Sequence, residues 1–141
     1  MAYNEARGLI DPFGGREDIK KKIIRCVGDP EKRFSEDALR IIRALRFSAV
    51  CGFEIEADTA TAARALSYKL CGIAAERIYA ELKKLLLADS PSRVLIKYRD
   101  IFERILPECF GSEVFDAEMC VAADYMPKDF ALRLAAVCAV A

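Results

Sequence analysis

Apolar residues recur at helical spacing through most of the chain after residue 35. Ser35 is a suitable N-cap, and apolar side chains then follow every three or four residues as far as Gly52. Asp58 can cap a second segment of this kind, and Ser90 with Pro91 can start another. The further segments with helical spacing are residues 58–70, 74–88, 91–104, 113–124 and 130–141. The pattern therefore predicts a mostly α-helical bundle.

The first 30 residues have a different pattern, rich in glycine and proline. Residues 8–15 and 23–27 are predicted to be short extended segments that end in turns. Two such segments do not form a stable sheet by themselves, so either they lie against the helices or they belong to a sheet whose other strands are missing. At the other end, residues 130–141 are apolar almost all round and carry no C-cap. We therefore expect a segment cut from a longer polypeptide at both ends.

The composition is that of a folded protein. The chain has 141 residues, of which 54% are hydrophobic and 31% are charged, and its formal net charge is zero. This length suffices for one domain with a real core, and this balance separates the chain from disordered sequences. Neither a membrane-spanning apolar run nor a secretory signal is visible in the sequence. We expect a cytoplasmic protein with no membrane partner.

Two residue types limit the chemistry. The chain contains no histidine, which excludes Ser-His-Asp and Cys-His catalysis and His-ligated zinc within it. None of its six cysteines forms a C-x-x-C pair, and most lie in apolar periodic runs. We expect them to be small buried side chains, reduced as in the cytosol. The aromatic residues Phe47, Phe53, Tyr79 and Tyr98 are likewise expected in the core.

The densest polar pattern starts at Asp37, where Arg40, Arg43 and Arg46 follow at intervals of three residues. On a helix these side chains are near neighbours along one slowly rotating face. Such a row is commonly a solvated ion-pair face. It also suits base recognition, because a carboxylate accepts from an exocyclic amine while a guanidinium donates to ring nitrogens or phosphates. Spacing alone leaves both interpretations open, and no general base or nucleophile stands beside the row.

The residues around this row resemble a known family. The run from Arg25 to Phe47 is R-C-V-G-D-P-E-K-R-F-S-E-D-A-L-R-I-I-R-A-L-R-F. It resembles the tRNA nucleotidyltransferase and poly(A) polymerase family, and more narrowly the class II, bacterial-type CCA-adding enzymes. Further resemblance lies upstream in G-L-I-D-P-F-G-G-R-E-D-I, and downstream in G-F-E-I and in E-R-I with E-L-K-K-L-L. It covers about residues 1–90 and is thin beyond residue 107.

The resemblance implies an activity and an architecture. These enzymes add C, C and A to the 3′ ends of tRNA without a nucleic-acid template, using CTP, ATP and Mg²⁺. Their fold is a head with a small sheet, followed by a helical neck, body and tail. By this match, residues 1–29 are the remnant of the head, residues 30–90 are the neck with its nucleotide-recognition helix, and residues 91–141 are the truncated start of the RNA-binding body.

The family's E-D-x-x-R motif falls on Glu36, Asp37 and Arg40. The match implies that Asp37 and Arg40 pair with the incoming base and that Arg43 approaches the nucleotide and its triphosphate. The implied supporting residues are Glu36, Arg25, Asp29, Arg33, Phe34, Glu76 and Arg77. Those of the preceding motif, Arg25 to Phe34, couple head and neck movements in the family.

The chain also departs from the family pattern. It contains no D-x-D arrangement, which in the family holds two metal ions for nucleotidyl transfer. We therefore expect no catalytic residues, no metal ligands and no catalysis by this chain alone, with Mg²⁺ bound elsewhere in the parent enzyme. A poly(A) polymerase or a CC- or A-adding enzyme of the same family stays open. An alternative of another class is a non-catalytic helical RNA-binding module.

Overall fold

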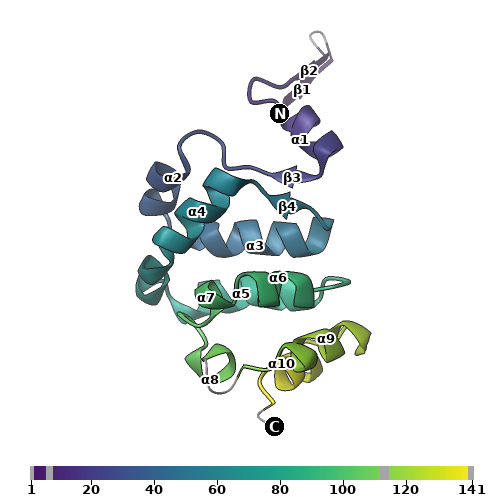
Figure 1. The fold of residues 1–141 in the computed structure, drawn as a ribbon. Helices are drawn as coiled ribbons and strands as arrows, with labels where there is room; N and C mark the ends of the chain where they lie inside the picture. The colour runs from purple at the N-terminus through teal and green to yellow at the C-terminus, as the bar shows by residue number, and fades with distance from the viewer. Residues whose placement is uncertain (1, 6–7, 112–114, 140–141) are drawn as a thin grey trace.

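The structure is a computed structural model that describes residues 2–5, 8–111 and 115–139. Its helices are stacked in layers along one direction, with the two ends of the chain at opposite ends of the stack (Figure 1). The helices are α1 (Gly15–Lys21), α2 (Pro30–Glu36), α3 (Leu39–Cys51), α4 (Ala57–Ala65), the 3₁₀ helix η1 (Ser67–Gly72), α5 (Ala75–Leu86), α6 (Ser92–Lys97), α7 (Arg99–Phe102), α8 (Pro107–Phe110), α9 (Ala117–Tyr125) and α10 (Phe130–Val137). The predicted mostly α-helical class is confirmed.

The described strands are short and form two separate pairs. They are β1 (Ala2–Asn4), β2 (Gly8–Ile10), β3 (Ile23–Ile24) and β4 (Glu54–Ile55). β1 and β2 form an antiparallel hairpin, whereas β3 pairs in parallel with β4, which follows α3. The extended segments near residues 8 and 23 thus each have one partner strand among the described residues. The parallel pair ties the chain before α2 to the chain after α3.

The predicted start of the first long helix at Ser35 was wrong. A separate helix, α2, begins after Asp29, whose carboxylate accepts hydrogen bonds from the backbone N–H groups of Glu31 and Lys32. Pro30 takes the first helical position, where its missing N–H costs nothing. Asp-Pro is therefore the N-terminal signal here, and Ser35 lies inside the helix that it starts.

Helix α2 ends at Glu36 with Asp37 as its C-cap, and α3 starts at Leu39. Asp37 has extended backbone, with φ −151° and ψ 102°. Its Oδ1 accepts a hydrogen bond from the backbone N–H of Leu39 at 3.1 Å, which satisfies a free donor at the start of α3. The family-like pair Asp37 and Arg40 is therefore divided between a junction and a helix.

Other helix limits also differ from the pattern. Glu56, and not Asp58, caps α4, because its carboxylate accepts from the backbone N–H of Thr59 at 2.8 Å. The predicted helix over 58–70 is α4 followed by η1, and the one over 91–104 divides at Tyr98 into α6 and α7. The predicted limits at 113 and 141 fall on residues outside the described part of the chain.

The core lies between α3 and α5 and continues into the later helices. α3 packs on α5, α5 also contacts α10, and α6 packs on α9. The fully buried aliphatic side chains at the centre are Ile41, Ile42, Leu45, Leu70, Leu85, Leu86 and Leu95. They follow the helical spacing read from the sequence, so this part of the prediction is confirmed.

Two contacts hold the C-terminal helices in place. Arg133 in α10 is 2% exposed, and its guanidinium donates to the carbonyls of Leu86 at 2.7 Å and Ala88 at 2.6 Å, at the end of α5. Cys109 in α8 and Cys138 after α10 form a disulfide. The expectation of six reduced, buried cysteines was wrong, since these two are bonded and Cys51 and Cys71 are exposed.

Candidate functional site

The carboxylate of Asp37 is held from two helices at the α2–α3 junction. Its Oδ1 binds the N-terminus of α3 through the N–H of Leu39. Its Oδ2 accepts a hydrogen bond from Nη2 of Arg77, at the start of α5, at 3.3 Å. The Asp37 side chain is 30% exposed. The arrangement fixes the carboxylate while leaving it accessible to a hydrogen-bond donor from solvent.

Arg40 and Arg43 follow Asp37 on α3. The backbone N–H of Arg40 donates to the carbonyl of Asp37 at 3.1 Å, so both residues belong to one turn of chain. Within the described residues, the buried Nε atom of Arg40 has no hydrogen-bond partner, and neither Arg40 nor Arg43 forms an ion pair. A buried N–H donor without a partner is costly. This turn therefore offers a fixed acceptor and an unfilled donor close together.

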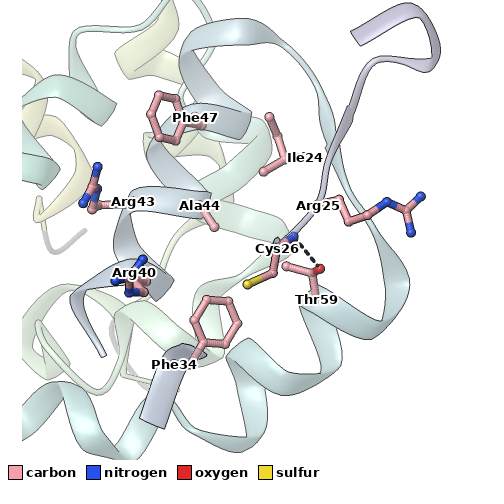
Figure 2. Close-up of a pocket in the computed structure, with 9 residues that line it drawn as sticks. All are labelled: Ile24, Arg25, Cys26, Phe34, Arg40, Arg43, Ala44, Phe47 and Thr59. Carbon is pink, nitrogen blue, oxygen red and sulfur yellow. Dashed lines mark hydrogen bonds between the residues drawn. The ribbon is translucent and has the colours of Figure 1, made fainter. Parts of the chain in front are cut away.

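A pocket of about 200 Å³ opens beside this turn (Figure 2). Arg40, Arg43 and Phe47 point to one side of α3, and the segment around Cys26 forms the opposite wall. The residues lining it are Ile24, Arg25, Cys26, Phe34, Arg40, Arg43, Ala44, Phe47 and Thr59. Of the predicted site residues, the pocket brings together Arg25, Phe34, Arg40 and Arg43. Asp37 lies at the junction next to Arg40 and does not line the pocket.

A larger pocket of about 630 Å³ adjoins the first and shares Ile24, Arg25, Cys26 and Phe47 with it. Its lining includes the apolar side chains of Phe13, Ile19, Val27 and Phe53. Phe13, Ile19 and Val27 are each more than half exposed. Phe47 thus stands at the edge between a small basic pocket and a larger apolar one.

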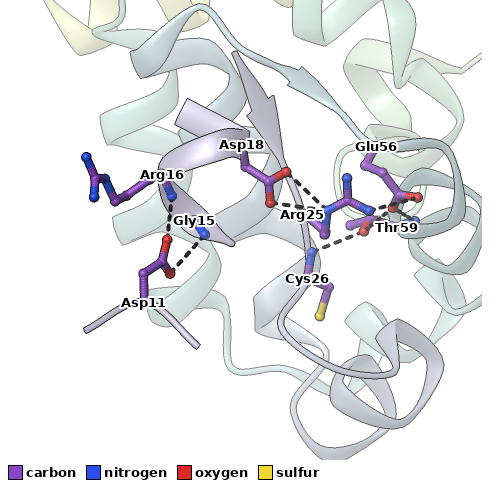
Figure 3. A network of polar contacts seen from close by, with 8 residues as sticks. All are labelled: Asp11, Gly15, Arg16, Asp18, Arg25, Cys26, Glu56 and Thr59. Carbon is purple, nitrogen blue, oxygen red and sulfur yellow. Dashed lines mark hydrogen bonds and ion pairs between the residues drawn. The ribbon is translucent and has the colours of Figure 1, made fainter. Parts of the chain in front are cut away.

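Arg25 links α1 to the start of α4 (Figure 3). Its Nε donates to Asp18 Oδ2 at 3.1 Å, and its Nη1 lies 3.8 Å from Glu56 Oε1. The hydrogen bond to Asp18 raises the pKa of Arg25, while the Thr59 N–H lowers the pKa of the Glu56 carboxyl. The Thr59 hydroxyl in turn accepts from the backbone N–H of Cys26. Arg25 therefore holds the pocket wall against two helices.

The other predicted supporting residues have separate positions. Arg33 and Glu36 form an exposed ion pair on α2, with Nη1 and Oε2 2.8 Å apart. Asp29 caps the same helix. Phe34 is 2% exposed and forms part of the pocket floor. Glu76 lies in the first turn of α5, beside Arg77 but outside the pocket.

Five residues that line the pocket were not predicted as site residues, namely Ile24, Cys26, Ala44, Phe47 and Thr59. Burial raises the pKa of the Cys26 thiol, and the nearby Arg33 and Arg40 oppose this effect. Thr59 is 2% exposed and bonds both Cys26 and Glu56. Phe47 was expected in the core but is 41% exposed, as Tyr79 is at 49%, whereas Tyr98 is buried as expected. An apolar residue one turn after Arg43 was the signal that could have placed Phe47 at the site.

The described residues do not assemble a metal site. Nowhere in this part of the chain do three His, Cys, Asp or Glu side chains gather closely enough to hold an ion. They therefore do not fit the Mg²⁺ that the family resemblance implies. Among the described helices, none has the length and apolar character needed to cross a membrane.

Comparison with known sequences finds a family model and several relatives that resemble this chain. Residues 52–110 match the family model described as "Probable RNA and SrmB- binding site of polymerase A". A CCA-adding enzyme of Leuconostoc mesenteroides is 53% identical over 108 residues, which is 76% of this chain and 27% of that protein. A CCA-adding enzyme of Anoxybacillus flavithermus is 47% identical over 95 residues, 67% of this chain and 24% of that protein. The chain thus spans about a quarter of these relatives' length.

Solved structures give the same result. The CCA-adding enzyme of Bacillus stearothermophilus in complex with CTP matches with a TM-score of 0.71 and 36% identity, over 89% of this chain and 31% of that one. A tRNA nucleotidyltransferase complexed with a primer tRNA and an incoming ATP analog matches with a TM-score of 0.64 and 30% identity, over 79% of this chain and 32% of that one. Both share more than a short motif with this chain, because the matched regions include most of its helices.

Proposed function

Because the chain belongs to the tRNA nucleotidyltransferase and poly(A) polymerase family, we propose that it is the nucleotide-reading part of an enzyme that adds CCA to tRNA 3′ ends. The observation that carries this proposal is the turn at the α2–α3 junction. There Asp37 presents an accessible carboxylate, and Arg40 presents a buried Nε donor that has no partner among the residues that the structure describes. The ligand complexes of the structural relatives with CTP and with an ATP analog support it.

An acid and a guanidinium side by side select for two of the four bases. Cytosine and adenine each present an exocyclic amine donor next to a ring-nitrogen acceptor on the pairing edge. The Asp37 carboxylate accepts from the amine, and the Arg40 guanidinium donates to the ring nitrogen. Uracil and guanine present a keto oxygen next to a ring N–H, which would face these groups acceptor to acceptor and donor to donor. One side-chain pair therefore serves both CTP and ATP.

The remaining site residues support this pair. Arg43, exposed and without an ion pair among the described residues, binds the triphosphate by charge-assisted hydrogen bonds. Arg77 orients the Asp37 carboxylate, and Glu76 accompanies it at the start of α5. Arg25, Asp29, Arg33, Phe34 and Glu36 hold the segments that frame the pocket. The division at residues 29/30 and 90/91 into head, neck and body stays a prediction.

The transfer reaction itself is assigned to the parent enzyme. Mg²⁺ stabilises charge on the phosphates and activates the attacking hydroxyl when it is bound. The described residues do not supply its ligands, so this chain's part in the reaction is to bind and orient the base and the phosphates. A cytoplasmic location follows from this role in tRNA processing.

The proposal is tested by equilibrium dialysis of the chain with each of the four nucleoside triphosphates. We expect CTP and ATP to bind more tightly than UTP and GTP, and Asp37→Ala to abolish this preference. Glu118→Ala is the matched control, since Glu118 is an exposed carboxylate on α9, which packs on α6 and α10. Equal binding of all four nucleotides to the unaltered chain, or an unchanged preference in Asp37→Ala, would contradict base reading by this pair.

The family model match favours a second function for the same chain. Its description names RNA binding, and the matched residues 52–110 cover α4 to α8. We propose that these helices bind the RNA substrate, whether the parent adds CCA, a partial CCA end or poly(A). As a helical module without catalytic residues, the chain would then bind RNA with an affinity that falls as salt concentration rises.

A further inference from the structure

Phe47 is an aromatic residue exposed where a helix surface usually carries a polar side chain. It is 41% exposed and lies one helical turn after Arg43 on the same side of α3 (Figure 2). It lines both pockets described above, and residues 52–110 of the RNA-binding match do not include it. Neither the core nor the base-reading pair accounts for this position.

The ring of Phe47 is held in place by a charged pair. The guanidinium carbon of Arg46 lies over the ring, 4.0 Å from its centroid. Arg46 is itself fixed, because its Nε lies 2.8 Å from Glu81 Oε2 on α5 and the two side chains are only 16% and 14% exposed. A cation over an aromatic face is attractive, so the pair orients the ring. The result is a pre-oriented aromatic surface that faces the pockets.

The neighbours of Phe47 favour a nucleic-acid ligand. Arg40 and Arg43 line the pocket beside it and have no ion pair within the described residues. An aromatic face next to free guanidinium groups is the combination that binds single-stranded nucleic acid, since bases stack on the ring while cations bind the phosphates. Since the proposed function assigns these arginines to the incoming nucleotide, a base that stacks on Phe47 lies beside that nucleotide.

The positions of Arg40 and Phe47 on α3 indicate which base stacks on Phe47, that of the incoming nucleotide or one of the RNA. Arg40 and Phe47 are seven residues apart, so their Cα atoms are separated by about 10 Å along the helix. Asp37 lies at the α2–α3 junction and lines neither of the two pockets that Phe47 lines, so a base paired with Asp37 lies apart from the ring of Phe47. We infer that Phe47 is a stacking platform for a base of the RNA 3′ end, distinct from the base of the incoming nucleotide. This inference rests on the proposed function, because it takes the Asp37–Arg40 turn to be the nucleotide's position.

The chain offers a direct reporter, because it contains no tryptophan. In Phe47→Trp the indole is the only one, and a stacked base quenches its fluorescence. We expect a short oligocytidylate RNA to quench it and CTP alone to leave it nearly unchanged. Tyr125→Trp is the control, since Tyr125 is 87% exposed on α9 and lies outside both pockets. Equal quenching of the two reporters by RNA, or equal quenching of Phe47→Trp by CTP, would overturn the assignment.

Affinity measurements separate stacking from a merely structural role. Replacing Phe47 by Leu keeps an apolar side chain but removes the ring, and we expect RNA binding to weaken about five- to 150-fold. Phe47→Tyr keeps the ring and should bind as the unaltered chain does. Unchanged RNA binding in Phe47→Leu, or no RNA binding by the unaltered chain at low salt, would overturn the inference.

The same variants distinguish this inference from the proposed function. Phe47→Leu should bind CTP as tightly as the unaltered chain, and Asp37→Asn should bind RNA as tightly. If Asp37→Ala keeps the nucleotide preference while RNA still quenches Phe47→Trp, base recognition by Asp37 is wrong and the stacking role of Phe47 stands. If Asp37→Ala loses the nucleotide preference and Phe47→Leu binds RNA as the unaltered chain does, base recognition by Asp37 stands and the stacking role of Phe47 is wrong.

Discussion

Replacing Arg133 by Met should destabilise the chain strongly, although Arg133 is far from the candidate site. Its guanidinium is buried and donates to four carbonyls, those of Leu86, Ala88, Met126 and Pro127. The first two lie at the end of α5, and the other two follow α9. The charge is therefore compensated by the carbonyl ends of helices, where the helix dipole favours a cation.

The expected cost follows from the acceptors left behind. The hydrogen bonds to Leu86 and Ala88 are fully buried, and each carbonyl without its donor costs about 1–3 kcal/mol. Part of this loss is offset because Met does not bury a charge. We expect the free energy of unfolding to fall by about 3 kcal/mol, and the melting temperature by about 10 °C for a domain of this size.

Urea unfolding followed by circular dichroism measures this change. Lys128→Met is the matched control, because Lys128 is 60% exposed, pairs with the exposed Asp89, and should cost less than about 1 kcal/mol. Arg133→Lys should fall between the two, since an ammonium group reaches fewer of the four carbonyls. A loss in Arg133→Met no larger than in Lys128→Met would refute the view that this guanidinium joins α10 to α5.

Three further predictions concern single contacts. Reducing the Cys109–Cys138 disulfide, which closes a separation of 29 residues, should lower the unfolding free energy by about 3–4 kcal/mol, and a melting temperature indifferent to reductant would contradict this. Asp29→Ala removes the cap of α2 and should cost about 1 kcal/mol in urea unfolding, whereas no change would mean that water replaces the cap. Since the pKa of Glu56 is lowered chiefly by the Thr59 N–H, its contribution is complete above the ordinary Glu range and is lost as pH falls through the lower folded value. Glu56→Gln should therefore flatten the acid limb of a stability–pH profile, and an unchanged limb would exclude this contribution.

The sequence predicted the helices of the core better than the limits of the site. Ile41, Ile42 and Leu45 recur at a period that tertiary packing reinforces, so their burial follows directly from the pattern. The break at Asp37 does not follow from it, because a carboxylate next to a helical run fits either inside the first turn or at a cap. Asp29 and Pro30 mark the start of α2, whereas Ser35, which also resembles an N-cap residue, lies inside that helix.

Other features depend on contacts between distant parts of the chain. The pairing of Cys109 with Cys138 requires α8 and the end of α10 to meet, which spacing alone does not specify. The exposure of Phe47 likewise depends on what packs beside α3, and periodicity gives only the face on which it lies. The positions of the four carbonyls around Arg133 depend on where α5 and α9 end, so no short sequence motif predicts them.

The position of Asp37 at the α2–α3 junction has a consequence for the fidelity of base selection. A residue inside a helix moves only with that helix. Asp37 instead lies between α2 and α3 and is also hydrogen-bonded to Arg77 of α5. If Asp37 reads the base, a small rotation of α2 or α5 changes the direction of its carboxylate relative to the Arg40 guanidinium on α3. The angles between α2, α3 and α5 then affect the discrimination between a pyrimidine and a purine. Substitutions far from the nucleotide can change these angles.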